Sequence, residues 1–233
     1  MWGASTSPCK SAVLRYLDEL TPAVRLIGAC NTVTADEEGR LTGHNTDGTG
    51  FVRNLREHGV DVKGKRLVVF GAGGAATAIC VQAALEGAAQ VAIFNRNDKF
   101  YPNGQRVAQR IAQAVPGCRT GICRMEDQTA LAEAVEGCDI LVNATRVGMR
   151  PLDKVTLVDP LLFRRELVVA DAVYEPEETR MLREARNAGC RTVGGLGMLL
   201  WQGVDAFRLF TGRDMPVEKV AERFFWPRAD GAL

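Results

Sequence analysis

Histidine is scarce in this chain, which has only His44 and His58 among its 233 residues. Two histidines cannot supply an H-E-x-x-H motif or a multi-histidine centre, so the sequence predicts no metal site. The seven cysteines are odd in number and include no C-x-x-C pair, which predicts reduced thiols in a cytoplasmic protein. Any acid and base chemistry therefore has to rest on other residue types.

The chain also lacks an excess of either charge and any long apolar run. It carries 29 Lys and Arg against 28 Asp and Glu, so no overall field attracts a nucleic acid or an anionic membrane. No segment approaches the roughly 18 apolar residues of a membrane span, and the N-terminal MWGASTSPCK has no apolar targeting region. We predict a cytoplasmic protein with no nucleic-acid or membrane partner, which binds any anionic ligand through local features.

Short apolar runs alternate with segments of helical periodicity from about residue 63 to residue 200. This alternation predicts an α/β fold with a Rossmann-type parallel sheet built from βαβ units. The expected strands lie at residues 67–70, 91–94, 140–142, 167–170 and 191–193, and the expected helices at 75–85, 107–115, 130–135 and 177–187.

The two flanks predict a second, smaller α/β domain that binds the substrate. Thr21 and Pro22 are typical of a helix start, and Gly28 of a helix end. The expected flanking elements are helices at 10–20, 22–28, 202–210 and 216–225 and strands at 30–34 and 41–44. Because we expect the last two helices to fold back on the first 60 residues, residues 1–60 plus 203–233 form the predicted substrate domain. Residues 61–202 form the predicted nucleotide domain.

A glycine-rich turn follows the first expected strand of the nucleotide domain, in the string VVFGAGGAATA. Gly71, Gly73 and Gly74 lie between a strand and a helix, where the backbone can approach a pyrophosphate and the helix N-terminus can bind it. The sequence therefore predicts dinucleotide binding. The alternative is a glycine turn in an α/β domain that binds no nucleotide.

The next expected strand ends in FNRND, at residues 94–98, where the adenosine ribose should lie. Asp98 can accept hydrogen bonds from the ribose hydroxyls and repels a 2′-phosphate, which favours NAD. Arg96 can pair with that phosphate, which favours NADP. We predict NAD and leave NADP open, and either side chain can instead be a solvated loop charge.

Polar residues gather in the N-terminal part, at Asn31 and in the segment 45–48. Asp47 precedes a segment with helical spacing, so it is either a helix cap or a carboxylate that holds a cation and a substrate hydroxyl. Because histidine is scarce, the partner for proton transfer would be a lysine, and Lys10 starts the first expected helix. The alternative for Lys10 is an ordinary surface lysine.

Seven segments, taken in this order, resemble the shikimate dehydrogenase family, and the match runs from about residue 5 to residue 225. The FNRND, GTGF and WQG strings are most similar to its quinate/shikimate dehydrogenase branch. The segments are residues 10–33 (with DELTP and NTV), GHNTDGTGF at 43–51, VVFGAGGAA at 68–76, FNRND at 94–98, NATRVGM at 143–149, DAVYEP at 171–176 and GGLGMLLWQG at 194–203.

The resemblance implies NAD(P)-dependent interconversion of shikimate, or quinate, and its 3-dehydro keto acid, within chorismate and aromatic amino acid biosynthesis. It implies that Lys10 is the general acid and base and that Asp47 binds the reacting hydroxyl. Asn31, Gln202 and Tyr174 would bind or line the substrate, and a homodimer is left open. The implied cofactor-binding residues are Ala72, Gly73, Gly74 and Ala75 for the pyrophosphate, Asn95, Arg96, Asn97 and Asp98 for the adenosine, and Arg146, Ala172, Val173, Tyr174, Glu175, Gly197 and Met198 for the nicotinamide half.

The chain departs from this family before the lysine. The family has a strand and a helix there, with a Ser-x-Ser-type segment for the substrate carboxylate, whereas here the chain starts almost at Lys10. We therefore expect an incomplete substrate domain with an exposed sheet edge. Two hypotheses follow: a working dehydrogenase, or a catalytically impaired nucleotide-binding remnant. A methylenetetrahydrofolate dehydrogenase is a remoter alternative of similar topology.

Overall fold

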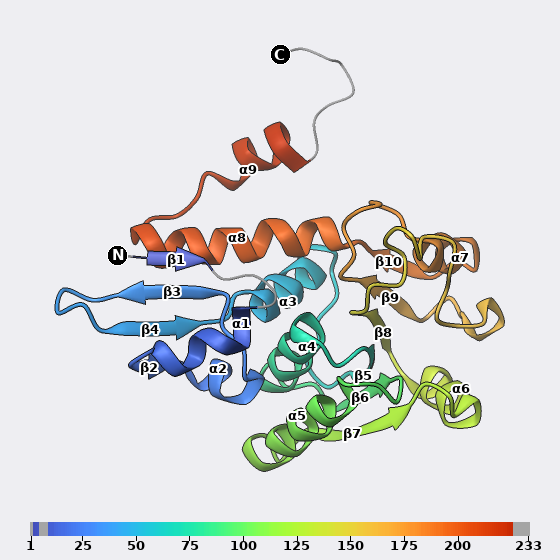
Figure 1. The fold of residues 1–233 in the computed structure, drawn as a ribbon. Helices are drawn as coiled ribbons and strands as arrows, with labels where there is room; N and C mark the ends of the chain where they lie inside the picture. Colours follow the sequence, from blue (N-terminus) through green and yellow to red (C-terminus); the bar gives the residue numbers. More distant parts are fainter. Residues whose placement is uncertain (1, 5–8, 226–233) are drawn as a thin grey trace.

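A computed structural model describes residues 2–4 and 9–225 of the chain, which form two sheets joined by helices (Figure 1). The larger sheet has six parallel strands in the order β10-β9-β8-β5-β6-β7, and the smaller sheet has four strands in the order β1-β3-β4-β2. The predicted α/β fold with a Rossmann-type sheet and a smaller second sheet is confirmed.

The larger sheet is apolar in its central strands because both of its faces are covered by helices. Its strands are β5 (Arg66–Phe70), β6 (Gln90–Asn95), β7 (Arg119–Arg124), β8 (Ile140–Asn143), β9 (Val168–Asp171) and β10 (Arg191–Val193). The connecting helices are α4 (Gly74–Leu85), α5 (Tyr101–Ala114), α6 (Gln128–Gly137) and α7 (Arg180–Asn187). Side chains alternate along β5, so that Leu67 and Val69 enter one core cluster while Val68 and Phe70 enter the other.

The smaller sheet contains β1 (Trp2–Ala4), β2 (Glu19–Leu20), β3 (Thr32–Ala35) and β4 (Leu41–His44). Strands β3 and β4 lie at the two predicted strand positions and pair antiparallel, and β1 lies at the edge beside β3. Helix α1 (Cys9–Ala12) continues as a 3₁₀ turn, and α2 (Pro22–Ile27) has the predicted caps, because the Thr21 hydroxyl accepts a hydrogen bond from Val24 N and Gly28 is left-handed at φ 74°.

Helix α3 (Asp47–Glu57) joins the two halves, because it packs on α4 of the larger sheet and on α8 (Gly195–Thr211). Glycines permit both approaches. A Cβ at Gly48 would lie 2.6 Å from Ala78 O, and a Cβ at Gly50 would lie 2.5 Å from Gln202 N. Helix α8 therefore folds back on the N-terminal part, as expected, and is followed by α9 (Val217–Val220) and a π-helical turn (Ala221–Phe225) (Figure 1).

Five elements differ from the sequence prediction. Strands β1, β2 and β7 were not predicted, and α8 begins at Gly195 rather than at residue 202. The helix expected over residues 10–20 ends at Tyr16, because the chain then extends into β2. Within the described residues, no helix is both long and apolar enough to cross a membrane.

Candidate active site

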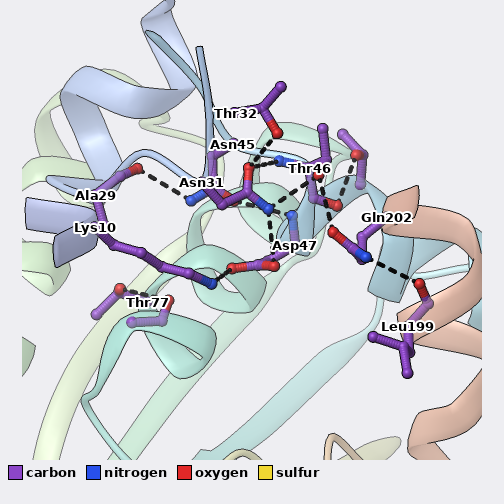
Figure 2. A network of polar contacts seen from close by, with 12 residues as sticks. Lys10, Ala29, Asn31, Thr32, Asn45, Thr46, Asp47, Thr77, Leu199 and Gln202 are labelled. Atoms are coloured by element: carbon purple, nitrogen blue, oxygen red, sulfur yellow. Dashed lines mark hydrogen bonds and ion pairs between the residues drawn. The ribbon is translucent and has the colours of Figure 1, made fainter. Parts of the chain in front are cut away.

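Lys10 and Asp47 form an ion pair between the first helix and the start of α3. The Lys10 Nζ lies 2.6 Å from Asp47 Oδ2, and the two side chains are only 20% and 11% exposed. Figure 2 shows the lysine stem reaching toward the carboxylate. The structure therefore brings together the two predicted catalytic residues, and Lys10 is not a freely solvated surface lysine.

The Asp47 carboxylate is used for this contact and not for capping. Thr46 occupies the N-cap position of α3, and its side chain makes no capping hydrogen bond. Asp47 Oδ1 accepts a hydrogen bond of 3.0 Å from Asn31 Nδ2, while Oδ2 faces Lys10. Of the two readings for Asp47, the geometry favours the carboxylate that holds a cation.

Asn31 is buried and fixes the orientation of Asp47. Its Nδ2 donates to both Asp47 Oδ1 and Thr46 Oγ1, at 3.0 Å each. Its Oδ1 accepts from Thr46 N and from the Thr32 hydroxyl, at 2.9 Å each. Because both amide hydrogens are already engaged, the side chain has a defined position before any ligand binds.

Gln202 lies on α8 and reaches the same network. Its Oε1 accepts a hydrogen bond from Thr46 Oγ1 at 3.5 Å, and its Nε2 donates to Leu199 O at 3.1 Å (Figure 2). The predicted residues Lys10, Asp47, Asn31 and Gln202 are therefore parts of one polar network. Tyr174, the remaining predicted substrate residue, is 47% exposed in the loop after β9.

The sequence analysis missed a second link between α3 and α8. The Thr49 hydroxyl donates to Asp205 Oδ2 at 2.5 Å, and its oxygen also lies 3.2 Å from Thr46 O. These three residues and His44 help to line a pocket of about 600 Å³, a volume in the range of small-molecule sites. The position of Asp205, three residues after Gln202 on a helix, was the available sequence signal.

The glycine-rich loop after β5 has the geometry that a pyrophosphate requires. Gly71 has φ 106°, and a Cβ there would lie 2.9 Å from Ala144 O, so only glycine fits without strain. Cβ atoms built at Gly73 and Gly74 meet no described atom within 4 Å. Gly73 is the N-cap residue of α4, so no capping side chain occupies the amides at the start of the helix. The first amides of α4 can therefore receive an anion.

The glycine-rich loop also contacts helix α5. The Asn103 side chain donates to Ala72 O at 2.9 Å, and a Cβ at Gly104 would lie 3.1 Å from the Ala72 Cβ. These contacts fix the backbone of the loop from the side of α5.

Asp98 lies in the loop after β6, as the ribose prediction requires. Its Oδ1 accepts hydrogen bonds from Asn95 Nδ2 and Phe100 N, at 2.9 Å each. Desolvation would raise the pKa of the Asp98 carboxyl, but hydrogen bonds from Phe100 N and Asn95 and the charge of Arg96 outweigh it and lower that pKa. Asp98 is thus ionised at neutral pH.

The residues predicted for the nicotinamide half lie in the loops after β8 and β9 and at the start of α8. A Cβ at Gly195 would lie only 2.4 Å from Val173 O, so the first turn of α8 abuts the loop after β9. Met198 is buried and belongs to the same core cluster as Ala170 of β9. The predicted nicotinamide residues therefore lie at the carboxyl ends of neighbouring parallel strands, which is the edge of the sheet where dinucleotides bind in such folds.

These features define an α/β protein with a Rossmann-type dinucleotide fold and a partly buried lysine–aspartate pair. A family model for the Shikimate 5'-dehydrogenase C-terminal domain matches residues 195–223. A shikimate dehydrogenase (NADP(+)) of Listeria innocua is 46% identical over 96% of this chain and 76% of its own length. A quinate/shikimate dehydrogenase of Escherichia coli is 46% identical over 92% of this chain and 74% of its own length.

Among solved structures, the shikimate 5-dehydrogenase of Listeria monocytogenes in complex with shikimate and NAD superimposes with a TM-score of 0.92. The two sequences are 45% identical, and the match covers 95% of this chain and 76% of the Listeria monocytogenes chain. The chain belongs to the shikimate dehydrogenase family. The resemblance stated from the sequence motifs is thereby confirmed.

Proposed function

We propose that this protein is an NAD(P)-dependent dehydrogenase that oxidises a ring hydroxyl of shikimate or quinate to the keto acid and catalyses the reverse reduction. The observation that carries the proposal is the partly buried Lys10–Asp47 pair, with 2.6 Å between Nζ and Oδ2, in a chain that also has a glycine-rich loop at the start of α4. The relatives named as shikimate and quinate/shikimate dehydrogenases supply the substrate class.

Lys10 is the proposed general acid and base. A dinucleotide bound at the glycine-rich loop would accept or supply a hydride, so the reacting oxygen has to lose a proton in the oxidation and gain one in the reduction. Lys10 Nζ transfers that proton, and Asp47 holds the ammonium by its Oδ2. Asn31 keeps the carboxylate in place through Oδ1, so that the pair needs little rearrangement when substrate binds.

Substrate hydroxyls are proposed to bind at the Asp47 carboxylate and at Asn31 and Gln202, with Tyr174 lining the site. Hydrogen bonds through Thr46 support this assignment. The Thr46 hydroxyl accepts from Asn31 Nδ2 and donates to Gln202 Oε1, so both side chains belong to the polar network around Asp47.

The dinucleotide is proposed to bind across the carboxyl edge of the larger sheet. The pyrophosphate meets the first amides of α4, and Asp98 binds the ribose hydroxyls through the oxygen that Asn95 and Phe100 leave free. This carboxylate favours NAD over NADP, because a 2′-phosphate would lie beside a negative charge. The proposed contacts to the adenosine are completed by Asn95, Arg96 and Asn97, and those to the nicotinamide half by Arg146, Ala172, Val173, Glu175, Gly197 and Met198.

Three broader assignments are part of the proposal. Residues 1–60 plus 203–233 form the substrate domain and residues 61–202 the nucleotide domain, although α8 continues through the boundary at residue 202. The protein acts in the cytoplasm, in chorismate and aromatic amino acid biosynthesis.

A direct assay tests the activity. The purified chain is incubated with shikimate or quinate at millimolar concentration and with NAD⁺ or NADP⁺, and reduction is followed by the absorbance of the reduced dinucleotide. Turnover that disappears in the Lys10→Met variant supports the proposal. Dinucleotide binding without any turnover of either acid would refute it and favour the catalytically impaired remnant.

A further inference from the structure

Asp171 is a buried carboxylate that the proposed proton transfer does not use. It is the last residue of β9 and is 1% exposed. Its register partner on β8 is Asn143, which is also the last residue of its strand and equally buried. The two side chains therefore lie at the edge of the sheet from which the two following loops depart.

The carboxylate accepts hydrogen bonds from three neutral groups. Asn143 Nδ2 donates to its two oxygens at 3.0 and 3.1 Å, Val173 N donates to Oδ1 at 2.8 Å, and the Thr179 hydroxyl donates to Oδ2 at 2.7 Å. Among the described residues, no cation pairs with Asp171. A buried carboxylate without a cation is costly, and its four hydrogen bonds to neighbouring loops indicate a geometric role.

These hydrogen bonds connect the loop after β8 and the loop after β9 at Asp171. Asn143 Nδ2 also donates to Val147 O at 2.8 Å, which ties down the loop that carries Arg146. Val173 and Thr179 begin and end the loop after β9. A Cβ at Gly148 would lie 2.7 Å from Thr179 Cγ2, so the two loops are also in direct contact.

The loop after β9 also contacts the start of α8. Val173 O lies 2.4 Å from where a Cβ of Gly195 would be, and Asn54 Nδ2 on α3 donates to Gly194 O at 2.9 Å. A shift of the loop after β9 would therefore move the first turn of α8. That helix carries Gln202 into the polar network around Asp47.

The order of the strands indicates which half of a dinucleotide these loops meet. The pyrophosphate loop follows β5, and the adenosine residues follow β6, on one side of β5. Strands β8 and β9 lie on the other side of β5, so the loops after them face the opposite half of a ligand that lies across this edge.

We propose that Asp171 is a positioning residue, which holds the loops after β8 and β9 in the arrangement that receives the nicotinamide ring. This inference rests on the proposed dinucleotide function. Asp171 does not contact the reacting atoms; it acts through Val173, Thr179 and Asn143. In Asp171→Asn, the new amide group faces Asn143 Nδ2, which is also a donor, so the loops separate while the phosphate loop is unchanged.

The test separates the two halves of the ligand. We expect Asp171→Asn to lower kcat by about 10- to 100-fold, the scale of a misplacement near 1 Å. The Kd of ADP-ribose, which has no nicotinamide, should stay unchanged, and the emission of bound NADH should shift toward that of free NADH. Asp139→Asn, at the opposite edge of the same sheet, is the matched control and should change none of these values.

A second pair of variants covers the case in which Asp171→Asn does not fold. Thr179→Ser keeps the hydroxyl and should retain kcat and NADH emission, whereas Thr179→Val should lose both. Parallel losses of ADP-ribose affinity and kcat, or an unchanged NADH emission, would overturn the inference. The emission and ADP-ribose measurements need no turnover, so they judge Asp171 even if neither shikimate nor quinate is a substrate.

Discussion

Replacing Lys10 by methionine tests the catalytic pair most directly, because methionine keeps an unbranched stem and removes the charge. Loss of a general acid and base lowers turnover by about 10²- to 10⁴-fold. We expect this loss in kcat, with little change in the Kd of NAD⁺ or NADP⁺, because Lys10 contacts Asp47 and lies outside the glycine-rich loop.

The same substitution should destabilise the fold by a moderate amount. An exposed ion pair contributes up to about 1 kcal/mol, and removal of one partner from a fully buried pair costs about 3–5 kcal/mol. The Lys10 and Asp47 side chains are 20% and 11% exposed, which places the pair between these limits, at about 1–3 kcal/mol. Urea denaturation measures this loss, and the exposed Lys63→Met is the matched control.

The double variant Lys10→Met with Asp47→Asn distinguishes a functional pair from two separate contributions. It leaves no unpaired carboxylate, so its free energy of unfolding should recover part of the loss caused by Lys10→Met alone. Its kcat should be no lower than that of Lys10→Met, because residues that act as a unit are not additive. Losses in kcat that multiply, or a Lys10→Met variant with normal kcat, would refute the paired role.

Three further predictions concern the cofactor, the pH dependence and the helix packing. Asp98→Ala should weaken NAD⁺ binding more than NADP⁺ binding in fluorescence titrations, and equal effects would contradict the ribose assignment. Burial raises the pKa of Asp171 from 3.8 to about 6, so the folded state retains a proton that the unfolded state has lost between these values. Its contribution to the free energy of unfolding should fall by about 2 kcal/mol as the pH rises from 4 to 6, and Asp171→Asn should remove that slope in urea titrations. Gly50→Ala should destabilise the protein by about 1–3 kcal/mol through its clash with the Gln202 backbone, whereas Gly137→Ala, which has open space, should not.

The Rossmann half of the fold was predictable because its central strands are buried on both faces and appear in the sequence as short apolar runs. Strand β7 was missed for the complementary reason. It lies at the edge of the sheet, and its residues RTGICR are largely exposed, so they carry no such run. The start of α8 was missed because Gly194, Gly195 and Gly197 are poor helix formers, yet they permit close contact with Val173 and Asn54.

The candidate catalytic residues were proposed from residue type and motif, but their arrangement in space was not predictable. Asp47 had two readings in the sequence, as a cap or as a carboxylate that holds a cation. Only the fold decides between them, because the contacts of the carboxylate come from Asn31, directly before β3, and from Lys10 on α1. Such contacts between residues distant in the chain leave no local pattern.

The glycines of α3 show how the two halves of the site are held at a fixed separation. Gly48 permits contact with α4, which begins at the phosphate loop, and Gly50 permits contact with α8, which carries Gln202. Asp47 lies at the start of the same helix, so its carboxylate is positioned relative to both the glycine-rich loop and Gln202. A side chain at either glycine would widen one gap, and the proton and hydride would then be transferred from misaligned groups.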